Sequence, residues 1–193
     1  MREREKSKEK IFERLLKKDI EKALDFAITH KLEKEYFEKG FERALEIDLI
    51  TALYFAKEGN LEKEYFEKGF KAALEKGYSG IALEFARESI LGREYFVKGF
   101  EDALRAKLYE DALKFAEMGN LSKEYFQKGF EEALKFCFYE EALEFAEAGN
   151  LEEYNINLAR ASNGRCISYL DEITLPNGKK IPVYLIIELH REE

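Results

Sequence analysis

The sequence has few of the residues on which most catalytic and metal sites depend. Its 193 residues include two cysteines, two histidines and no tryptophan. Cys137 and Cys166 stand in unrelated contexts, which argues against a disulfide framework and a cysteine zinc site. His30 and His190 are far apart in the sequence and form no metal pair on one helix. Because a phosphate-binding glycine loop and a nucleophile elbow are also missing, we predict that the protein is not an enzyme and uses no metal or cofactor.

Long apolar runs are missing as well. No stretch approaches the roughly 18 residues that span a bilayer, and the first residues contain no apolar signal segment. We therefore expect a cytoplasmic protein that does not bind membranes. A net charge of −8 disfavours nucleic acid as a partner. The abundance of lysine and glutamate, with Gln127 as the only glutamine, is typical of thermophile proteins.

What the sequence has instead is an internal repeat of two interleaved phrases. The first phrase reads KEYFEKGFERALE at 34–46 and recurs at 63–75, 93–105 and 123–135. The second reads TALYFAKEGN at 51–60 and recurs at 81–90, 111–120 and 141–150. An eroded copy surrounds Phe12 and a half copy covers 151–161, as expected for terminal repeats that need one solvated face.

Both phrases have the periodicity of amphipathic helices. They predict an all-α solenoid of antiparallel helix pairs over residues 1–161, with about five repeats and ten or eleven helices. A glycine inside the first helix costs about 1 kcal/mol relative to alanine, so we infer that a neighbouring helix packs closely on Gly40, Gly69, Gly99 and Gly129. The second helices are followed by glycines in which we expect left-handed caps: Gly59, Gly119 and Gly149.

The phrases G-F-x-x-A-L and A-L-x-F-A resemble tetratricopeptide-type repeats over residues 8–161. The period here is about 30 residues where that family has 34, and the tryptophan and terminal proline of the family are absent. The resemblance implies a curved stack of helix pairs that serves as a docking surface for a peptide or protein. No residues of this sequence match that family's carboxylate clamp.

Strand-forming residues replace the helical pattern in 162–193, which predicts a C-terminal β-hairpin as a second domain. Its turn is either a two-residue loop at Asn177 and Gly178 or a three-residue loop that includes Pro176. With the longer loop, one face collects Ile167, Tyr169, Ile173, Leu175, Ile181, Val183, Leu185 and Ile187. We expect this face to cap the last repeat around Leu143, Phe145 and Leu158, and the outer edge to accept a strand from a partner or from a second copy in a homodimer.

A tyrosine and a lysine recur at the edge of the apolar face of each first helix. We predict that they form a partner-binding column of Tyr36, Lys39, Tyr65, Lys68, Tyr95, Lys98, Tyr125 and Lys128. Two structural alternatives remain open at this point. The lysines can pair with the glutamates four residues earlier, which are Glu35, Glu64, Glu94 and Glu124, and the tyrosines can shield the seams between repeats.

The resulting functional hypothesis is a non-enzymatic scaffold that docks an unknown protein or peptide segment on its repeat face. A helical repeat that binds nucleic acid through the same column is the alternative, and a cryptic enzyme is a third. Charge separates the first two, because a glutamate accompanies every lysine of the column and would repel phosphate groups.

Overall fold

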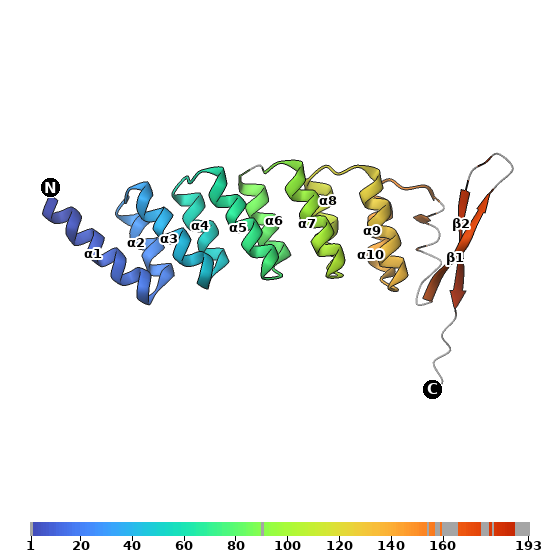
Figure 1. The fold of residues 1–193 in the computed structure, drawn as a ribbon, viewed down its shortest axis with the longest axis horizontal. Coiled ribbons are helices and arrows are strands. Elements are labelled where there is room, and N and C mark those ends of the chain that lie inside the picture. Colours follow the sequence, from blue (N-terminus) through green and yellow to red (C-terminus); the bar gives the residue numbers. More distant parts are fainter. Residues whose placement is uncertain are drawn as a thin grey trace, which may run out of the picture. The chain divides into compact units, whose positions relative to one another are not determined.

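The computed structural model describes residues 2–89, 91–153, 155–156, 159, 166–174, 178 and 180–187 (Figure 1). Contacts within the chain divide it into two compact units, Met1–Tyr95 and Phe96–Glu193, with the boundary inside one helix. The described residues form ten α-helices that pack as adjacent pairs, which confirms the predicted helical repeat. The first helices of the repeats are α1 (Arg2–Lys18), α3 (Lys34–Ile47), α5 (Lys63–Glu75), α7 (Arg93–Arg105) and α9 (Lys123–Lys135). The second helices are α2 (Ile20–Thr29), α4 (Leu49–Glu58), α6 (Ser79–Glu88), α8 (Tyr109–Met118) and α10 (Tyr139–Ala148).

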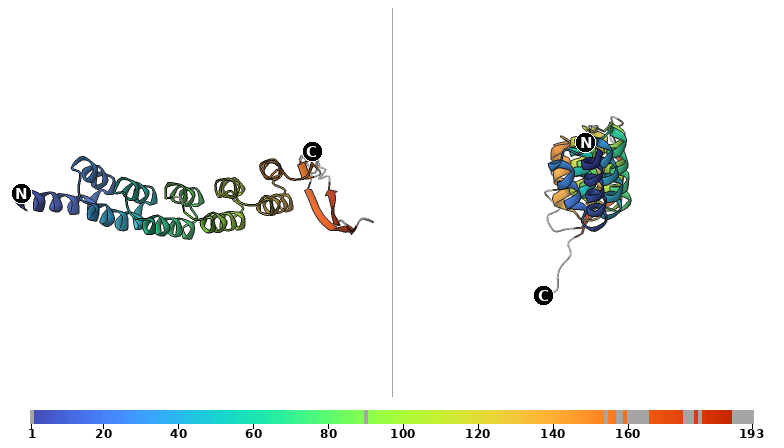
Figure 2. Two further views of the ribbon diagram at one scale, coloured as in Figure 1. Left: turned by 90° about the horizontal axis from the view of Figure 1, so that it is seen from above. Right: turned by 90° about the vertical axis from the view of Figure 1, so that its left-hand side faces the viewer.

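Unit 1 consists of two layers of helices. Each first helix packs on the second helix of its own repeat, and α2 packs on α4, α4 on α6 and α3 on α5. Figure 2 shows the two rows in the blue to green part of the chain. This arrangement follows from amphipathic helices that each bury one apolar face and leave a charged face in water.

The core of unit 1 is built from phenylalanine rings that lie over glycines. Phe55 and Phe85 of the second helices are fully buried. A Cβ built on Gly40 would lie 2.1 Å from the Phe55 ring, and one on Gly69 would lie 2.2 Å from the Phe85 ring. The predicted close approach of a helix to these glycines is therefore confirmed, because the ring takes the volume that any side chain would need.

Unit 2 repeats this contact. Phe115 and Phe145 are fully buried, and a Cβ on Gly99 or Gly129 would lie 2.3 or 2.4 Å from their rings. The rings of Phe145 and Phe100 also meet edge to face, with centroids 6.4 Å apart. Phe145 is thus covered by its own repeat and by the preceding one.

The ends of the second helices differ from the prediction. Gly59 has a right-handed conformation, and the left-handed residue is the following Asn60, with φ of 47°. Leu61 N–H then closes the helix on Ala56 C=O at 2.9 Å. Glycine is needed at 59 for another reason: its Cβ would lie 2.4 Å from Cβ of Phe37. Asparagine tolerates the left-handed region better than other side chains, so it takes that role. The same exchange occurs at Gly119 with Asn120 and at Gly149 with Asn150.

The loop between the two helices of a repeat explains why the period is 29 or 30 residues. In the shorter repeat, α3 passes directly into α4 through Asp48, whose carboxylate caps α4 by accepting from Ile50 N–H at 3.0 Å. The longer loops contain a residue of positive φ instead: Gly77, Lys107 or Cys137. Lys107 and Cys137 therefore occupy a conformation that favours glycine.

Two strands follow the helices, β1 (Cys166–Thr174) and β2 (Lys180–Ile187), and they pair antiparallel with each other only. Near the turn, Glu172 lies opposite Pro182. The register shifts between Tyr169 and Asp171, so that Ile167 lies opposite Ile186. The predicted uninterrupted register is therefore wrong, because a bulge shifts the pairing by one residue. The predicted turn residues Leu175, Pro176 and Asn177 lie outside the described residues.

The predicted fold class also needs correction. The fold is an all-helical repeat, and a hairpin cap on it is not shown. The cap was expected to cover Phe145, and the contacts shown for that side chain are with Gly129 and Phe100 of the helices. The backbone of β1 contacts α9, whereas the expected cap site lay on α10. Leu158 and the predicted domain boundary at residues 161 and 162 fall outside the described residues.

Candidate functional site

The tyrosines of the predicted column lie in the seams between repeats. In unit 1, Tyr36, Tyr65 and Tyr95 are partly buried. Each ring meets a phenylalanine of the preceding first helix edge to face; these partners are Phe12, Phe41 and Phe70, at centroid distances of 5.3, 5.2 and 5.3 Å. Burial raises the pKa of all three phenols. In unit 2, Tyr125 meets Phe100 in the same way at 5.4 Å.

The lysines of the column form ion pairs across repeats. Lys39 lies 3.5 Å from the carboxylate of Glu13, and Lys68 pairs with Glu42. In unit 2, Lys128 lies 3.4 Å from Glu101. The glutamate is on the preceding first helix in each case, so these contacts differ from the ion pairs within one helix that the sequence left open. All three lysine side chains remain about half exposed to solvent.

The structure brings one tyrosine and lysine of the column into direct contact. The Lys39 ammonium lies 5.7 Å from the centroid of the Tyr36 ring. Lys98 is exposed and has no ion pair within the part of the chain that the structure describes. The eight predicted residues therefore lie on first helices, the tyrosines between neighbouring repeats and the lysines at the surface.

A groove of about 330 Å³ lies on α9. Its lining forms one stripe along the helix: Lys123, Glu124, Gln127, Lys128 and Glu131. The side chain of Asn155 donates a hydrogen bond of 3.0 Å to Gln127. Asn155 stands four residues after Leu151, in the place where the other repeats have a tyrosine. Asn155, a smaller amide, therefore occupies the position that a tyrosine between repeats has elsewhere, and it lies beside the groove.

The sequence signal for this groove was the loss of the first phrase after residue 151. The half copy over 151–161 predicts only a terminal repeat with a solvated face. The groove contains one residue of the predicted column, Lys128, together with its neighbour Glu124. The other three lining residues were not among the predicted site residues.

A second surface was missed entirely. Apolar side chains are exposed at the loops inside the repeats, at Ile47, Ile50 and Tyr78 in unit 1 and at Leu108, Phe136 and Phe138 in unit 2. We call these residues the loop edge. The Lys107 ammonium lies 3.6 Å from the centroid of the Phe136 ring. Helical periodicity predicts which face of a helix is buried, and this periodicity ends at the loops. It therefore could not show that apolar residues in the loops are exposed.

The described residues contain no group of three or more histidine, cysteine, aspartate and glutamate side chains placed to hold a metal ion. Among the described helices, none combines the length and the apolar character that crossing a membrane requires. No family model, curated protein or solved structure matches the chain. The evidence on function is therefore the geometry of the repeat itself.

A buried tyrosine beside the loop edge gives a test of the structure in this region. Tyr109 is 3% exposed, and its hydroxyl donates to Glu132 C=O at 3.3 Å. Burial, with Glu132 and Glu141 nearby, raises its pKa from the usual 10.0. The folded state then keeps this proton when the unfolded state loses it, so the free energy of unfolding falls as the pH rises above about 10.

We expect Tyr109→Phe to make this decline shallower, as measured by urea denaturation between pH 9 and pH 11. Tyr78→Phe is the control, because it removes a phenol from a side chain that is 55% exposed. The control should keep the decline of the unsubstituted protein. Equal declines in both variants would mean that Tyr109 does not hold its proton in the folded state.

Proposed function

We propose that the protein is a non-enzymatic interaction scaffold that docks an extended segment of a partner protein on the face of its first helices. The groove on α9 carries this proposal. It is shallow and open to solvent, and lysines, glutamates and one amide line it. Such a lining offers hydrogen bonds and ion pairs to the backbone and side chains of an extended peptide.

The rigidity of the face supports the same function. Lys39, Lys68 and Lys128 form ion pairs with the preceding repeat. The tyrosines of the column pack on phenylalanine rings. A partner therefore meets side chains that have already lost much of their freedom, which lowers the entropic cost of binding. The resemblance to tetratricopeptide-type repeats, which dock peptides, agrees with this proposal.

The experiment combines peptide selection with photo-crosslinking. Peptides selected from a random displayed library against the full chain are tested on variants that carry a benzophenone side chain at one position. Glu64 of α5 and Glu131 of α9 sample the first-helix face, Glu144 the second-helix face and Leu108 the loop edge. All four positions are exposed.

We expect crosslinks from position 64 or 131 and none from position 144. Crosslinks from position 108 alone would move the docking site to the loop edge. A library that yields no binding peptide, with single-stranded RNA retained at low salt, would favour the nucleic-acid alternative and end the proposal.

A further inference from the structure

The stripe of α9 that lines the groove has an equivalent on every first helix, and we call it the outward stripe. In α3 it consists of Lys34, Glu35, Glu38, Lys39 and Glu42. In α5 it consists of Lys63, Glu64, Glu67, Lys68 and Lys71. The stripe of α3 therefore has three carboxylates against two lysines, and that of α5 has three lysines against two carboxylates.

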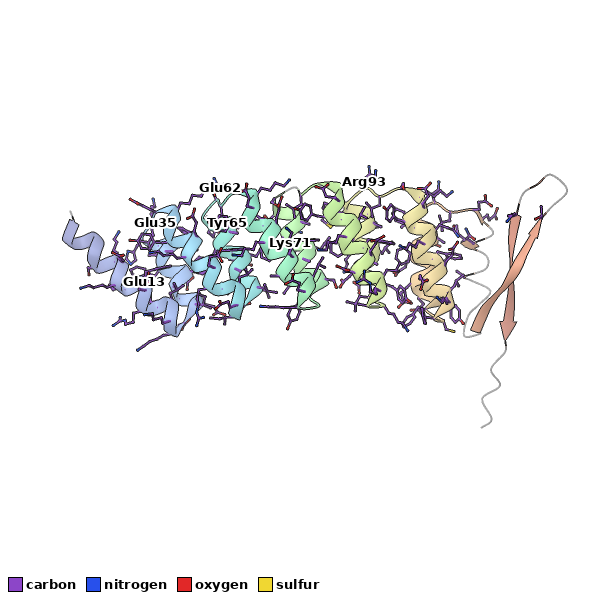
Figure 3. All side chains as sticks on the ribbon, viewed as in Figure 1. Glu13, Glu35, Glu62, Tyr65, Lys71 and Arg93 are labelled. Carbon is purple, nitrogen blue, oxygen red and sulfur yellow. The ribbon has the colours of Figure 1, made fainter. Side chains whose placement is uncertain are left out.

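The difference comes from one residue with a defined structural place. Lys71 stands where the first two repeats have Glu13 and Glu42. Those two carboxylates pair with Lys39 and Lys68 of the following helices. Lys71 is a cation, so it cannot form an ion pair with a lysine as those two glutamates do. It is exposed and has no ion pair or hydrogen bond within the described residues. Figure 3 shows Lys71 on α5.

A second difference between the repeats removes another carboxylate from the same region of unit 1. Glu62, which precedes α5, pairs with Lys34 of the repeat before it. The equivalent residue before α7 is Gly92, which offers no carboxylate to Lys63. Lys63 is paired instead with Glu67 of its own helix, at a long 3.8 Å. The carboxylate that Glu62 supplies to Lys34 therefore has no counterpart for Lys63 of α5.

We propose that the outward stripe of α5 binds an acidic segment of the partner protein, with Lys71 as the residue that meets a carboxylate. The inference rests on the proposed function and names the chemistry of its partner. In a chain of net charge −8, most of the surface repels an acidic segment, so a local surplus of cations selects where such a segment binds.

An acidic peptide fits this stripe better than a nucleic acid does. Glu64 and Glu67 stand among the lysines and would repel a continuous row of phosphates, whereas the carboxylates of a peptide can be spaced to avoid them. Stacking of bases also requires free aromatic faces. Tyr65, the tyrosine of the column on α5, is partly buried against Phe41.

The test repeats the peptide selection on the unsubstituted chain and on Lys71→Glu. We expect peptides selected by the unsubstituted chain to share an acidic position, and those selected by Lys71→Glu to carry lysine or arginine there. For the acidic peptide that is most enriched, Lys71→Gln should weaken binding about threefold and Lys71→Glu about tenfold. Added salt should reduce both differences, because the contact is exposed to solvent.

Gly80→Glu is the matched control. It changes the net charge by the same amount as Lys71→Gln, but it lies on α6, where nothing is within 4 Å of an added Cβ. It should leave peptide affinity within about twofold. Lys71→Arg keeps the charge and should also keep the affinity.

The outcomes separate this inference from the proposed function. Two results would overturn the inference and leave the scaffold function standing. In the first, the selected peptides crosslink to the first-helix face but share no acidic position. In the second, the peptides selected by Lys71→Glu keep the acidic position of those selected by the unsubstituted chain. Failure to select any peptide overturns both. Binding of an oligouridylate that Lys71→Glu abolishes, without any peptide binding, would assign the stripe to nucleic acid.

Discussion

Gly99→Leu is expected to destabilise the protein by more than about 3 kcal/mol, and Gly99→Ala by about 1–3 kcal/mol. Helix propensity alone predicts the opposite sign for alanine, which is better than glycine by about 1 kcal/mol inside a helix. Packing overrides propensity here, because an added Cβ would lie 2.3 Å from the Phe115 ring. That ring is fully buried, so it cannot turn away without moving α8. Urea denaturation of the full chain measures the effect.

Gly80→Ala is the control for a helical glycine on which no other residue packs. Gly80 also lies in a helix, but nothing is within 4 Å of its Cβ position. Alanine there should stabilise the protein by up to about 1 kcal/mol. Equal or higher stability of Gly99→Ala would show that α8 does not pack on this glycine.

Phe85→Ala should cost about 3–5 kcal/mol, the range for removal of a fully buried aromatic ring. The Phe85 ring lies over Gly69 and meets Phe66 with centroids 6.4 Å apart. Glycine has no side chain that could move into the space, so the cavity remains largely open. The free energy of unfolding, measured by urea denaturation, reports the loss.

Two comparisons make this prediction specific. Tyr54→Ala removes an aromatic ring that is 50% exposed and should change stability by less than about 1 kcal/mol. In Phe85→Leu, a second change of Gly69→Ala should be less harmful than it is in the unsubstituted protein, because the smaller side chain leaves room for a methyl group. Additive effects of the two changes would place Phe85 away from Gly69.

The helices and their order could be predicted from the sequence because the same pattern of apolar, small and charged residues recurs in each repeat. A glycine that recurs inside a helix at Gly40, Gly69, Gly99 and Gly129 has to be there for close packing, since propensity disfavours it each time. The ends of the elements were predicted less well. The left-handed role of Asn60 was assigned to Gly59, because the sequence does not show that the Cβ of Phe37 excludes a side chain there.

The predicted column lies on the first helices, but the contacts of its residues could not be predicted. Tyr36 and Tyr65 could be placed at the edge of an apolar face from helical periodicity alone. Whether a tyrosine at that edge faces water or a neighbouring repeat depends on how adjacent helices are staggered, and the structure places both rings against phenylalanines. The loop edge could not be predicted, because exposure of an apolar loop residue depends on the helices around it.

The sequence by itself determined the repeat, the helical character of both phrases and the need for close packing at the glycines, because these depend on interactions within a few turns of one helix. Only the tertiary structure decided which carboxylate each lysine meets. Lys68 has Glu64 one turn away on its own helix, yet it pairs with Glu42 of the preceding repeat. Partners from different repeats are brought together by packing of phenylalanine on glycine, a contact between helices that the spacing within one helix does not contain. Lys71 stands where the first two repeats have Glu13 and Glu42, has no ion pair among the described residues, and is the residue on which our inference about the partner rests.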